Sequence, residues 1–494
     1  MQLALSLSSH SSRTLQDQVF EQIRDMILST RLKSGDPVPG SRALAECLGV
    51  SRNTVTIAYD KLFSEGYLEI RPNVGTFVAQ DLPDLSLTLV GAQPDCTPCA
   101  EAPATPTLLD RISNDSFRVQ AVAHPAARRL RTDFWVGRVD PLGFPATEWR
   151  RIVDTKLRHG PQRQASYGDT QGEEALRRAI ADHVGPARGV ACTAEDILVV
   201  GGSQDGLMLI AQALQQHCPA FLHENPCYQG ACYIFERLGL TGHPVPVDRD
   251  GLVADALPDI RHAILYVTPS HQFPTGATLS LPRRLALLDW AERTDSLIIE
   301  DDYDGDFRYE GGPLTALRGL DRSGRVLYLG TFSKSMGPAL RLGFIVGSDR
   351  TIPALARWKH LFSNGTPWII QAAMAEFLDS GAFQRHLRRI RASYKRRRDV
   401  LIEEIGRHFP GSEIAGRRGG MHVSWRLPGT GRARHLQRLA QLRGIGIYTV
   451  EDGGACLSPG DGRHDDLLML GYAAIEEGQI ARAIALLGEL DRGN

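Results

Sequence analysis

Lys334 is the residue whose surroundings most clearly suggest chemistry. It lies in Gly330-Thr-Phe-Ser-Lys334-Ser-Met-Gly337, directly after the apolar run Val326–Leu329. That run predicts a buried strand, and ligand sites of open α/β sheets gather at the carboxyl ends of strands. An amine in a dry pocket loses its proton readily and can attack an aldehyde to form a Schiff base. A solvated loop lysine is the alternative, so the neighbouring residues must decide.

A group of carboxylates follows a second apolar run. The segment Glu300-Asp-Asp-Tyr-Asp304 comes directly after Leu297–Ile299. Such residues could hold the ring of a pyridoxal cofactor. A buried carboxylate at a strand end can keep the pyridine nitrogen of that ring protonated, and a neighbouring tyrosine can donate a hydrogen bond to its phenolate oxygen. Spacing does not choose between Asp301 and Asp302 for the pyridine. A solvated acidic loop or a divalent-metal site remains an alternative.

Further residues could complete a site for pyridoxal 5′-phosphate (PLP). The glycines of Gly201-Gly-Ser-Gln204 follow a strand and open a helix, where backbone N–H groups favour a phosphate. Ser333 and Arg341 flank the lysine and could add donors. Tyr228 also follows a strand and could stack on the ring. Each residue taken alone is equally compatible with a structural role.

The elements that must position these residues alternate between strands and helices from about residue 131 onward. Helix Leu281–Glu292 is one example, and six strands are expected: Ile197–Val200, Ala220–Leu222, Ala263–Val267, Leu297–Ile299, Val326–Leu329 and Phe344–Val346. This order predicts a mainly parallel sheet covered on both faces, which is an α/β fold.

Residues 1–80 predict a different module. Apolar spacing gives helices at Leu15–Leu28, Ser41–Leu48 and Arg52–Ser64, followed by a hairpin whose strands contain Tyr67–Ile70 and Thr76–Val78. Two short helices joined by a tight glycine turn form a helix-turn-helix, and the hairpin forms a wing. A recognition helix presents its first residues to the major groove. The candidate DNA contacts are Arg42, Ser51, Arg52, Asn53, Thr54, Thr56, Arg71 and Gly75.

Charge alone does not settle the partner of this module. Residues 1–80 contain eight Lys or Arg and eight Asp or Glu, whereas DNA-binding domains are usually basic. A small interaction domain without nucleic acid is therefore the alternative. The acidic residues Asp17, Glu21 and Asp25 lie on the first helix, while the arginines lie on the elements that would contact DNA. This segregation can replace a net positive charge.

The middle of the chain, residues 81–130, predicts a flexible linker because six prolines occur in it. Its Cys96 and Cys99 have no second pair at zinc spacing, so we expect no metal site there. The eight cysteines are scattered, and neither a signal peptide nor a transmembrane segment is evident. We therefore expect reduced thiols in a cytoplasmic protein. The net charge of −1 among 494 residues does not by itself indicate DNA or a membrane as a partner.

The N-terminal motifs identify a family. Residues 13–80 resemble the winged helix-turn-helix of GntR-type bacterial regulators. The segments that carry the resemblance are Leu32–Pro39, Ser41–Glu46, Leu48–Val55, Ala58-Tyr59, Glu65–Leu68 and Gly75–Val78.

The chain from residue 131 to about residue 490 resembles fold-type I aminotransferases, and the fusion resembles the MocR group of GntR regulators. The motifs are Ser166-Tyr-Gly168, Gly201–Gln204, Glu224-Asn-Pro226, Thr268–Gly276, Glu300–Asp304, Thr331–Lys334 and Arg341-Leu-Gly343. The resemblance implies that Lys334 is the Schiff-base lysine, Asp301 the pyridine partner and Tyr303 the phenolate-oxygen donor. It also implies phosphate contacts from Ser203, Gln204, Ser333 and Arg341, and stacking by Tyr228. Tyr167 would reach the neighbouring site of a homodimer, and a smaller α+β subdomain would follow at the C-terminus.

Two positions depart from the aminotransferase pattern. Phe273 precedes Pro274-Thr-Gly276 where many aminotransferases have asparagine, as is usual in the MocR group. Met469 stands where we would expect the arginine that clamps a substrate α-carboxylate, and an apolar side chain cannot form that bidentate pair. The effector is therefore expected to be PLP itself or an amine without an α-carboxylate, such as an amino-sulfonate.

We expect a PLP-dependent transcriptional regulator that binds operator DNA, with no physiological turnover beyond a residual transaminase half-reaction. Two alternatives remain. One is a working aminotransferase carrying a DNA-binding tether, and the other is a regulator that has lost PLP and uses the fold only to dimerise. The basic run Arg385–Arg398 is expected to be a surface helix, with a second DNA contact as its alternative.

Overall fold

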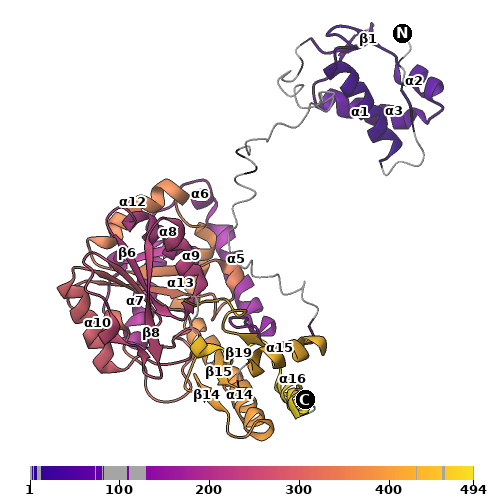
Figure 1. Cartoon of the computed structure of the whole chain (residues 1–494). Helices are drawn as coiled ribbons and strands as arrows, with labels where there is room; N and C mark the ends of the chain where they lie inside the picture. Colours follow the sequence, from indigo (N-terminus) through magenta and orange to yellow (C-terminus); the bar gives the residue numbers. More distant parts are fainter. Residues whose placement is uncertain are drawn as a thin grey trace, which may run out of the picture. The chain divides into compact units, whose positions relative to one another are not determined.

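The computed structural model describes residues 13–72, 74–80, 130–429, 431–458 and 462–492, with a few isolated positions (3, 5–7, 82, 108 and 110). The expected linker, including Cys96 and Cys99, lies almost entirely outside the described residues. The chain divides into two compact units, Met1–Ser116 and Phe117–Asn494, which are treated separately below (Figure 1). Within the described part of the chain, every helix is too short or too polar to span a bilayer.

The N-terminal unit contains the three predicted helices, α1 (Leu15–Leu28), α2 (Ser41–Leu48) and α3 (Arg52–Ser64). Buried side chains from all three form one core, with Ile23, Leu44 and Val55 almost completely shielded from solvent. Gly49 ends α2 in the left-handed conformation, which a glycine adopts without a Cβ penalty. The Ser51 hydroxyl caps α3 by accepting a hydrogen bond from the Thr54 N–H at 3.1 Å.

The predicted wing pairs β2 (Leu68–Arg71) with β3 (Gly75–Val78). A short strand, β1 (Pro37–Val38), pairs with the other edge of β3 and makes a three-stranded sheet. The sequence pattern missed β1 because two residues carry no periodicity. The unit is therefore a winged helix-turn-helix.

The second unit is built around an eight-stranded sheet with the strand order β5-β13-β12-β11-β10-β6-β8-β9. Its strands are β5 (Ile197–Val200), β6 (Ala220–Asn225), β8 (Thr241–Asp248), β9 (Gly251–Leu252), β10 (Ile264–Val267), β11 (Leu297–Asp302), β12 (Val326–Thr331) and β13 (Gly343–Val346). The neighbours from β8 through β12 run parallel, while β13 is antiparallel to both β12 and β5. All six predicted strands are present. Strands β6 and β11 continue three residues beyond their predicted ends.

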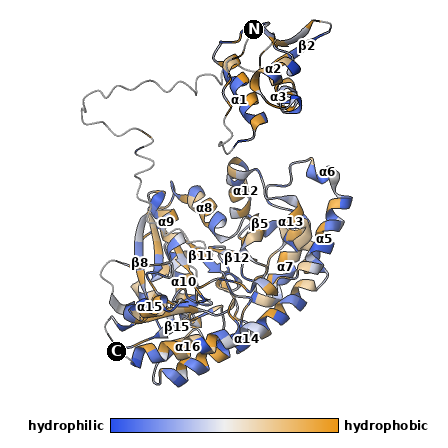
Figure 2. Ribbon diagram, turned by 90° about the vertical axis from the view of Figure 1, so that its right-hand side faces the viewer, coloured by the Kyte–Doolittle hydropathy of each residue, from blue (hydrophilic) through white to orange (hydrophobic). Residues whose placement is uncertain are grey.

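Helices cover both faces of this sheet (Figure 1). One face packs against α8 (Ser203–Leu214), α9 (Gln229–Arg237) and α12 (Thr351–Ser363). The other packs against α7 (Glu174–Arg188), α10 (Leu281–Arg293) and α13 (Trp368–Asp379). The central strands are therefore apolar on both sides, as expected for a parallel sheet. Figure 2 shows the complementary pattern on outer helices such as α5 (Ala146–His159), where hydrophilic and hydrophobic stretches alternate.

The C-terminal part forms a smaller α+β subdomain, as predicted. Its antiparallel sheet has the order β14-β15-β19-β17, with strands β14 (Glu413–Ala415), β15 (His422–Arg426), β17 (Tyr448–Thr449) and β19 (Leu467–Gly471). Helices α14 (Ala382–His408), α15 (Arg432–Leu442) and α16 (Glu477–Arg492) accompany it (Figure 1). The short strand β18 (Ala455–Cys456) leaves this subdomain and pairs with β7 (Cys227–Tyr228) of the larger one.

Candidate cofactor and DNA sites

The strand order brings the predicted cofactor residues to one edge of the sheet. Strands β5, β11 and β12 all end at this edge, and β13 starts there because it runs antiparallel to its neighbours. Asp301 is the penultimate residue of β11, and Lys334 follows β12. Ser203 opens the helix after β5, and Arg341 precedes β13.

The side-chain alternation of β11 separates the two candidate aspartates. Ile299 belongs to the core beneath α8 and α9, so Asp301, two residues later, faces the same side. Ile298 belongs to the opposite core, beneath α10, so Asp302 faces that side. There Asp302 forms an ion pair with Arg188 at 2.7 Å and accepts a hydrogen bond from the Tyr328 hydroxyl at 2.6 Å. The carboxylate of Asp302 is fully engaged by these two partners.

The other carboxylates of the cluster also have partners. Glu300 accepts hydrogen bonds from the backbone N–H groups of Leu317 and Arg318, both at 2.8 Å. Asp304 lies 2.7 Å from the imidazole Nδ1 of His271. A solvated acidic loop does not match these contacts, because each of these buried acids has its own protein partner. The metal alternative stays open at Asp304, because its carboxylate and the ring nitrogens of His271 and His422 all lie within 4.8 Å of one another.

Asp301 differs from the rest of the cluster. Its Oδ2 accepts a hydrogen bond from the Tyr266 hydroxyl at 2.8 Å, while its buried Oδ1 has no partner among the residues that the structure describes. Burial raises the pKa of Asp301 to about 7, although the bond from Tyr266 opposes the shift. A buried acceptor without a donor costs free energy, so this atom is suited to a ligand N–H. Tyr266 was not predicted as a site residue, because the apolar strand Ile264–Val267 gives no sign that its hydroxyl has a partner.

Lys334 is half-buried, and its Nζ donates a long hydrogen bond of 3.4 Å to the carbonyl oxygen of Gly137. Removal from water lowers the pKa of Lys334, and the nearby charges of Asp304 and Asp301 partly oppose the shift. A Cβ added to Gly137 would lie 2.9 Å from the amine, so the glycine leaves space for Lys334. The amine is therefore a better nucleophile than a solvated lysine.

The glycine turn before α8 and the Arg341 guanidinium form an anion cradle. Gly202 has φ +106°, and a Cβ placed on it would lie 3.4 Å from both terminal nitrogens of Arg341. Arg341 itself has φ +48°, the left-handed conformation that non-glycine residues seldom adopt. The cradle combines a helix N-terminus with a planar cation, which is the chemistry that binds a phosphate. Ser203 is the first residue of α8, and Ser333 lies nearby with its hydroxyl 3.0 Å from Thr331 Oγ1.

Aromatic side chains line the space beside this cradle. The Tyr228 hydroxyl donates to Gln204 Oε1 at 3.1 Å, which ties the predicted stacking residue to α8. Phe273 packs edge-on against both Tyr228 and Tyr303, with ring centroids 6.0 and 6.2 Å apart. The phenylalanine at the position where many aminotransferases have asparagine is thus a spacer between two tyrosines.

Tyr303 is positioned by His271, which the sequence analysis did not single out. The Tyr303 hydroxyl donates to the carbonyl oxygen of His271 at 3.1 Å. Two glycines of the β14–β15 loop enclose the imidazole: a Cβ on Gly420 would lie 2.1 Å from its ring, and one on Gly416 would lie 2.9 Å from Nε2. The smaller subdomain therefore packs against His271, the residue that positions Tyr303.

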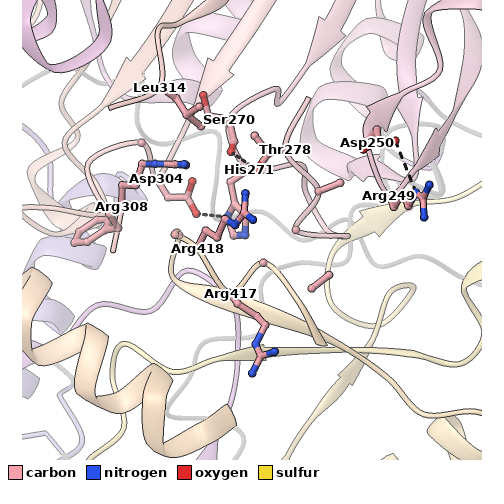
Figure 3. Close-up of a pocket in the computed structure, with 18 of the residues that line it drawn as sticks. Arg249, Asp250, Ser270, His271, Thr278, Asp304, Arg308, Leu314, Arg417 and Arg418 are labelled. Carbon is pink, nitrogen blue, oxygen red and sulfur yellow. Dashed lines mark hydrogen bonds and ion pairs between the residues drawn. The ribbon is translucent and has the colours of Figure 1, made fainter. Parts of the chain in front are cut away.

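A cavity of about 340 Å³ opens beside the His271–Asp304 pair (Figure 3). Five arginines are among its lining residues: Arg188, Arg249, Arg308, Arg417 and Arg418. Charges on Arg418 and Arg188 add to burial in lowering the pKa of Arg308. Five arginines against two aspartates, Asp250 and Asp304, give the lining an excess of positive charge, which favours anions in its neighbourhood.

Met469 lies in an apolar cluster next to the two tyrosines. It is fully buried on β19 and packs with Phe273, Val450, Ala455 and Leu467. Arg138, which follows Gly137, is held by an ion pair with Asp133 at 2.8 Å. Among the described residues the neighbours of Met469 in this cluster are therefore apolar, and its own side chain cannot form the bidentate pair of a carboxylate clamp.

Tyr167 is 88 % exposed, and residues 162–169 around it are all exposed. Within this chain it is not brought to Lys334. A large aromatic residue presented in this way is available to another molecule.

The predicted DNA residues occupy the first turn of α3, the start of α2 and the wing. Arg52 and Asn53 are exposed, whereas Val55 and Tyr59 of the same helix are buried. Thr54 and Thr56 are partly buried, and the Thr56 hydroxyl donates to the carbonyl oxygen of Arg52 at 3.0 Å. The first turn of α3 thus presents the hydrogen-bonding side chains of Arg52 and Asn53 to solvent beside the cap residue Ser51.

The remaining predicted DNA contacts lie outside α3. Arg42 is exposed on α2 and pairs with Glu46 at 3.2 Å. Arg71 lies 4.5 Å above the Phe77 ring, which fixes it on the wing, and Gly75 starts β3 with φ +142°. The wing tip also exposes Val74.

The basic run Arg385–Arg398 lies within α14 and is largely engaged in the fold. Arg397 pairs with Asp140 at 2.7 Å, and Arg398 pairs with Glu310 at 2.9 Å. Arg389 donates to the carbonyl oxygen of Gly143 at 2.9 Å. These contacts favour the structural interpretation over a second DNA contact.

The residues at the sheet edge fit PLP. A buried carboxylate oxygen without a protein donor suits the pyridine N–H, the Gly202–Arg341 cradle suits the phosphate, and an amine of lowered pKa suits the aldehyde. The spacer Phe273 and the tyrosines beside it provide aromatic surface for the ring.

Comparison with known families supports both units. Residues 15–78 match the model of the bacterial regulatory proteins of the gntR family, and residues 140–464 match that of the class I and II aminotransferases. The chain is 36 % identical, over 79 % of its length and 77 % of the relative, to the "Probable rhizopine catabolism regulatory protein MocR" of Rhizobium meliloti. It is 34 % identical, over 85 % of each chain, to the pyridoxine biosynthesis transcriptional regulator PdxR of Corynebacterium glutamicum.

A third regulator and two solved structures extend the comparison. The chain is 33 % identical to the transcriptional regulator TauR of Rhodobacter capsulatus, over 95 % of this chain and 96 % of the relative. The kynurenine aminotransferase of Pyrococcus horikoshii matches with a TM-score of 0.66 at 26 % identity, over 74 % of this chain and 91 % of that one. The α-aminoadipate aminotransferase LysN of Thermus thermophilus matches with a TM-score of 0.65 at 27 % identity, over 75 % and 97 %.

The predicted fold class is confirmed: an N-terminal winged helix-turn-helix is joined to an aminotransferase-like domain of fold type I. The role of a DNA-binding regulator is supported over that of a working aminotransferase with a tether, because full-length relatives are transcriptional regulators. The chain belongs to the MocR-type group of GntR-family transcriptional regulators.

Proposed function

We propose that this regulator holds PLP at Lys334 and uses the occupied site to set its affinity for operator DNA. One observation carries the proposal: Asp301 keeps a buried carboxylate oxygen without a donor at the edge of the sheet where Lys334 also lies. Nothing else among the described residues supplies that donor, and a protonated pyridine nitrogen would. When bound, PLP supplies an aldehyde for amines and a ring that withdraws electrons from them.

The protein side chains have separate tasks in this proposal. Lys334 forms the covalent attachment, and Asp301 holds the proton on the ring nitrogen. The phosphate is bound by Ser203, Gln204, Ser333 and Arg341. Tyr228 stacks on the ring, and Tyr303, held by His271, donates to the ring oxygen.

The site favours sensing over transamination of ordinary amino acids. Met469 offers no cation to an α-carboxylate, and Arg138 is committed to Asp133. We infer that the effector is PLP itself or an amine without an α-carboxylate, such as an amino-sulfonate.

The winged helix binds operator DNA in this account. Arg52 and Asn53 read base edges, supported by Ser51, Thr54 and Thr56, while Arg42, Arg71 and Gly75 approach the phosphates. Residues 1–80 form the DNA-binding part, residues 81–130 a linker, and residues 131–494 the part that binds PLP and dimerises. The exposed Tyr167 supports a homodimer in which this tyrosine reaches the partner's site.

Absorbance spectroscopy tests the cofactor assignment. Purified protein incubated with PLP should show the visible band of the lysine-bound cofactor, and borohydride should fix it on Lys334. Lys334→Ala should lack both signals, and Lys359→Ala is the control because Lys359 is a buried lysine whose pKa is also lowered. A wild-type spectrum identical to that of Lys334→Ala would refute the assignment and favour a regulator that has lost PLP.

A further inference from the structure

Four side chains with metal-binding atoms converge beneath Tyr228, in a part of the fold that the cofactor does not use. They are His223 on β6, Cys227 on β7, Cys232 on α9 and Cys456 on β18. His223, Cys227 and Cys232 are buried, and their ligand atoms all lie within 4.8 Å of one another. Local motif spacing does not reveal this group, because Cys456 is more than two hundred positions away from the others.

The spacing within this cluster resembles that of a metal shell. Cys227 Sγ lies 3.1 Å from Cys232 Sγ and 3.5 Å from His223 Nδ1. The Cys456 thiol interacts with Cys232, and its strand places it directly opposite Cys227. Tetrahedral Zn²⁺ with bonds of about 2.3 Å to sulfur separates its ligand atoms by roughly 3.8 Å. The ligand atoms of His223, Cys227 and Cys232 already lie close enough for one ion, and a change in the Cys456 side chain would bring in the fourth ligand.

The surroundings favour a metal over a set of reactive thiols. Apolar residues such as Phe221 and Phe235 pack around the cluster. Cys227 and Cys232 are completely buried, so without a metal these thiols have little access to oxidants. A divalent cation would offset the mutual repulsion of adjacent thiolates.

A carboxylate is also placed to orient the imidazole. The position that a Cβ of Gly242 would occupy lies 3.6 Å from His223 Nε2 and 3.1 Å from Glu236 Oε1, so both groups border the same small space. Histidine ligands of metals commonly direct their second nitrogen to a carboxylate. Ligation through Nδ1 replaces the 2.8 Å contact that this atom now makes with the carbonyl oxygen of Glu224.

We propose that Cys227, Cys232, Cys456 and His223 form a structural zinc site. Three thiolates and one imidazole are a ligand set typical of closed, tetrahedral Zn²⁺ sites. The half-buried Cys456 provides the entry path for the ion. The site would fasten β18 of the smaller subdomain to β7 of the larger one. It would thereby fix the backbone of Tyr228, the residue after Cys227.

Metal analysis of the full-length protein tests this proposal. Protein purified without chelator should contain one zinc per chain. After removal of zinc from reduced protein, Co²⁺ should restore a site with thiolate-to-cobalt absorbance and the visible bands of tetrahedral cobalt. Cys227→Ser and Cys232→Ser should lose stoichiometric zinc, while Cys456→Ser and His223→Gln should weaken zinc binding at least tenfold.

The other cysteines supply matched controls. Cys218→Ser and Cys192→Ser should retain full zinc content, because these half-buried thiols lie outside the cluster. The Cys96→Ser/Cys99→Ser double variant should also retain it. Loss of zinc in that double variant alone would overturn the proposal. So would the absence of a thiolate-to-cobalt band in reduced wild-type protein, or a disulfide between cluster cysteines in protein purified anaerobically. The cobalt measurement needs no variant, so misfolding of a variant cannot mask a negative result.

Discussion

The hydroxyl of Tyr266 donates a 2.8 Å hydrogen bond to Oδ2 of Asp301 and leaves Oδ1 of the same carboxylate buried, with no partner among the described residues. Both residues face the side of the sheet that α8 and α9 cover. This hydrogen bond orients Asp301 without using its second oxygen. On the opposite face, the carboxylate of Asp302 forms an ion pair with Arg188 and accepts a hydrogen bond from Tyr328. It is the most specific reason to assign the pyridine nitrogen to Asp301.

Cofactor retention should separate these two aspartates. Asp301→Asn removes the charge that stabilises a protonated ring nitrogen, so its affinity for PLP should fall by about 1.5–3 kcal/mol, the worth of a hydrogen bond to a charged group. Asp302→Asn should retain PLP affinity and instead lower the melting temperature, because it leaves the buried Arg188 without its partner. Titration of each variant with PLP, followed by absorbance, measures the first effect. Equal PLP affinity in wild type and Asp301→Asn would contradict the assignment.

The stability of PLP-free protein should depend on pH through Asp301. Its pKa is raised from 3.8 to about 7 in the folded state, so the folded chain holds a proton that the unfolded chain has lost. The stability from this group is present below pH 4 and is lost as the pH rises through 7. The loss is on the order of 4 kcal/mol. Asp301→Asn should reduce the difference in melting temperature between pH 5 and pH 8.

Glu224 has a similarly raised pKa of about 7, so the variant should remove only part of that dependence. Saturating PLP should also reduce it in wild type, because the ring nitrogen then provides a positive partner for Asp301. Identical pH profiles of wild type and Asp301→Asn would show that this carboxyl does not titrate as described.

Packing around His271 predicts the effect of one glycine substitution. A Cβ on Gly420 would lie 2.1 Å from the imidazole and 2.6 Å from Asp304 Oδ2, at φ +78°. Gly420→Ala should destabilise the C-terminal unit by about 2–4 kcal/mol, through overpacking and a left-handed backbone. Gly411→Ala is the matched control, because its φ is +82° but nothing lies within 4 Å of the added atom. Thermal unfolding should rank the control between wild type and Gly420→Ala, and the reverse order would disprove this packing argument.

The recognition helix can be tested separately from the cofactor. Arg52→Ala and Asn53→Ala should each cost about 1–3 kcal/mol of operator affinity if both side chains contact base edges. Their melting temperatures should be unchanged, because both residues are exposed. Arg443→Ala, an exposed arginine of the smaller subdomain, is the control for a general charge effect. Electrophoretic mobility shifts on DNA upstream of the gene itself measure the differences, and equal losses in all three variants would indicate non-specific attraction only.

The sequence predicted most of the architecture because its signals were local. Apolar runs located the six strands, and Ser51 and Gly49 marked helix ends by their capping chemistry. Strand alternation could have separated Asp301 from Asp302, but the strand was predicted to end at Ile299, three residues too early. The roles of His271, Tyr266 and the cysteine cluster depend on contacts between distant segments, which no local pattern records.

The central claim is that PLP at Lys334 changes DNA binding, and operator affinity with and without PLP tests it most directly. Fluorescence anisotropy should give a dissociation constant that changes at least fivefold when PLP-free wild-type protein is saturated with PLP. The Lys334→Ala variant should give the same constant in both conditions. An affinity that is unaffected by PLP in wild type, or that responds equally in Lys334→Ala, would contradict the account.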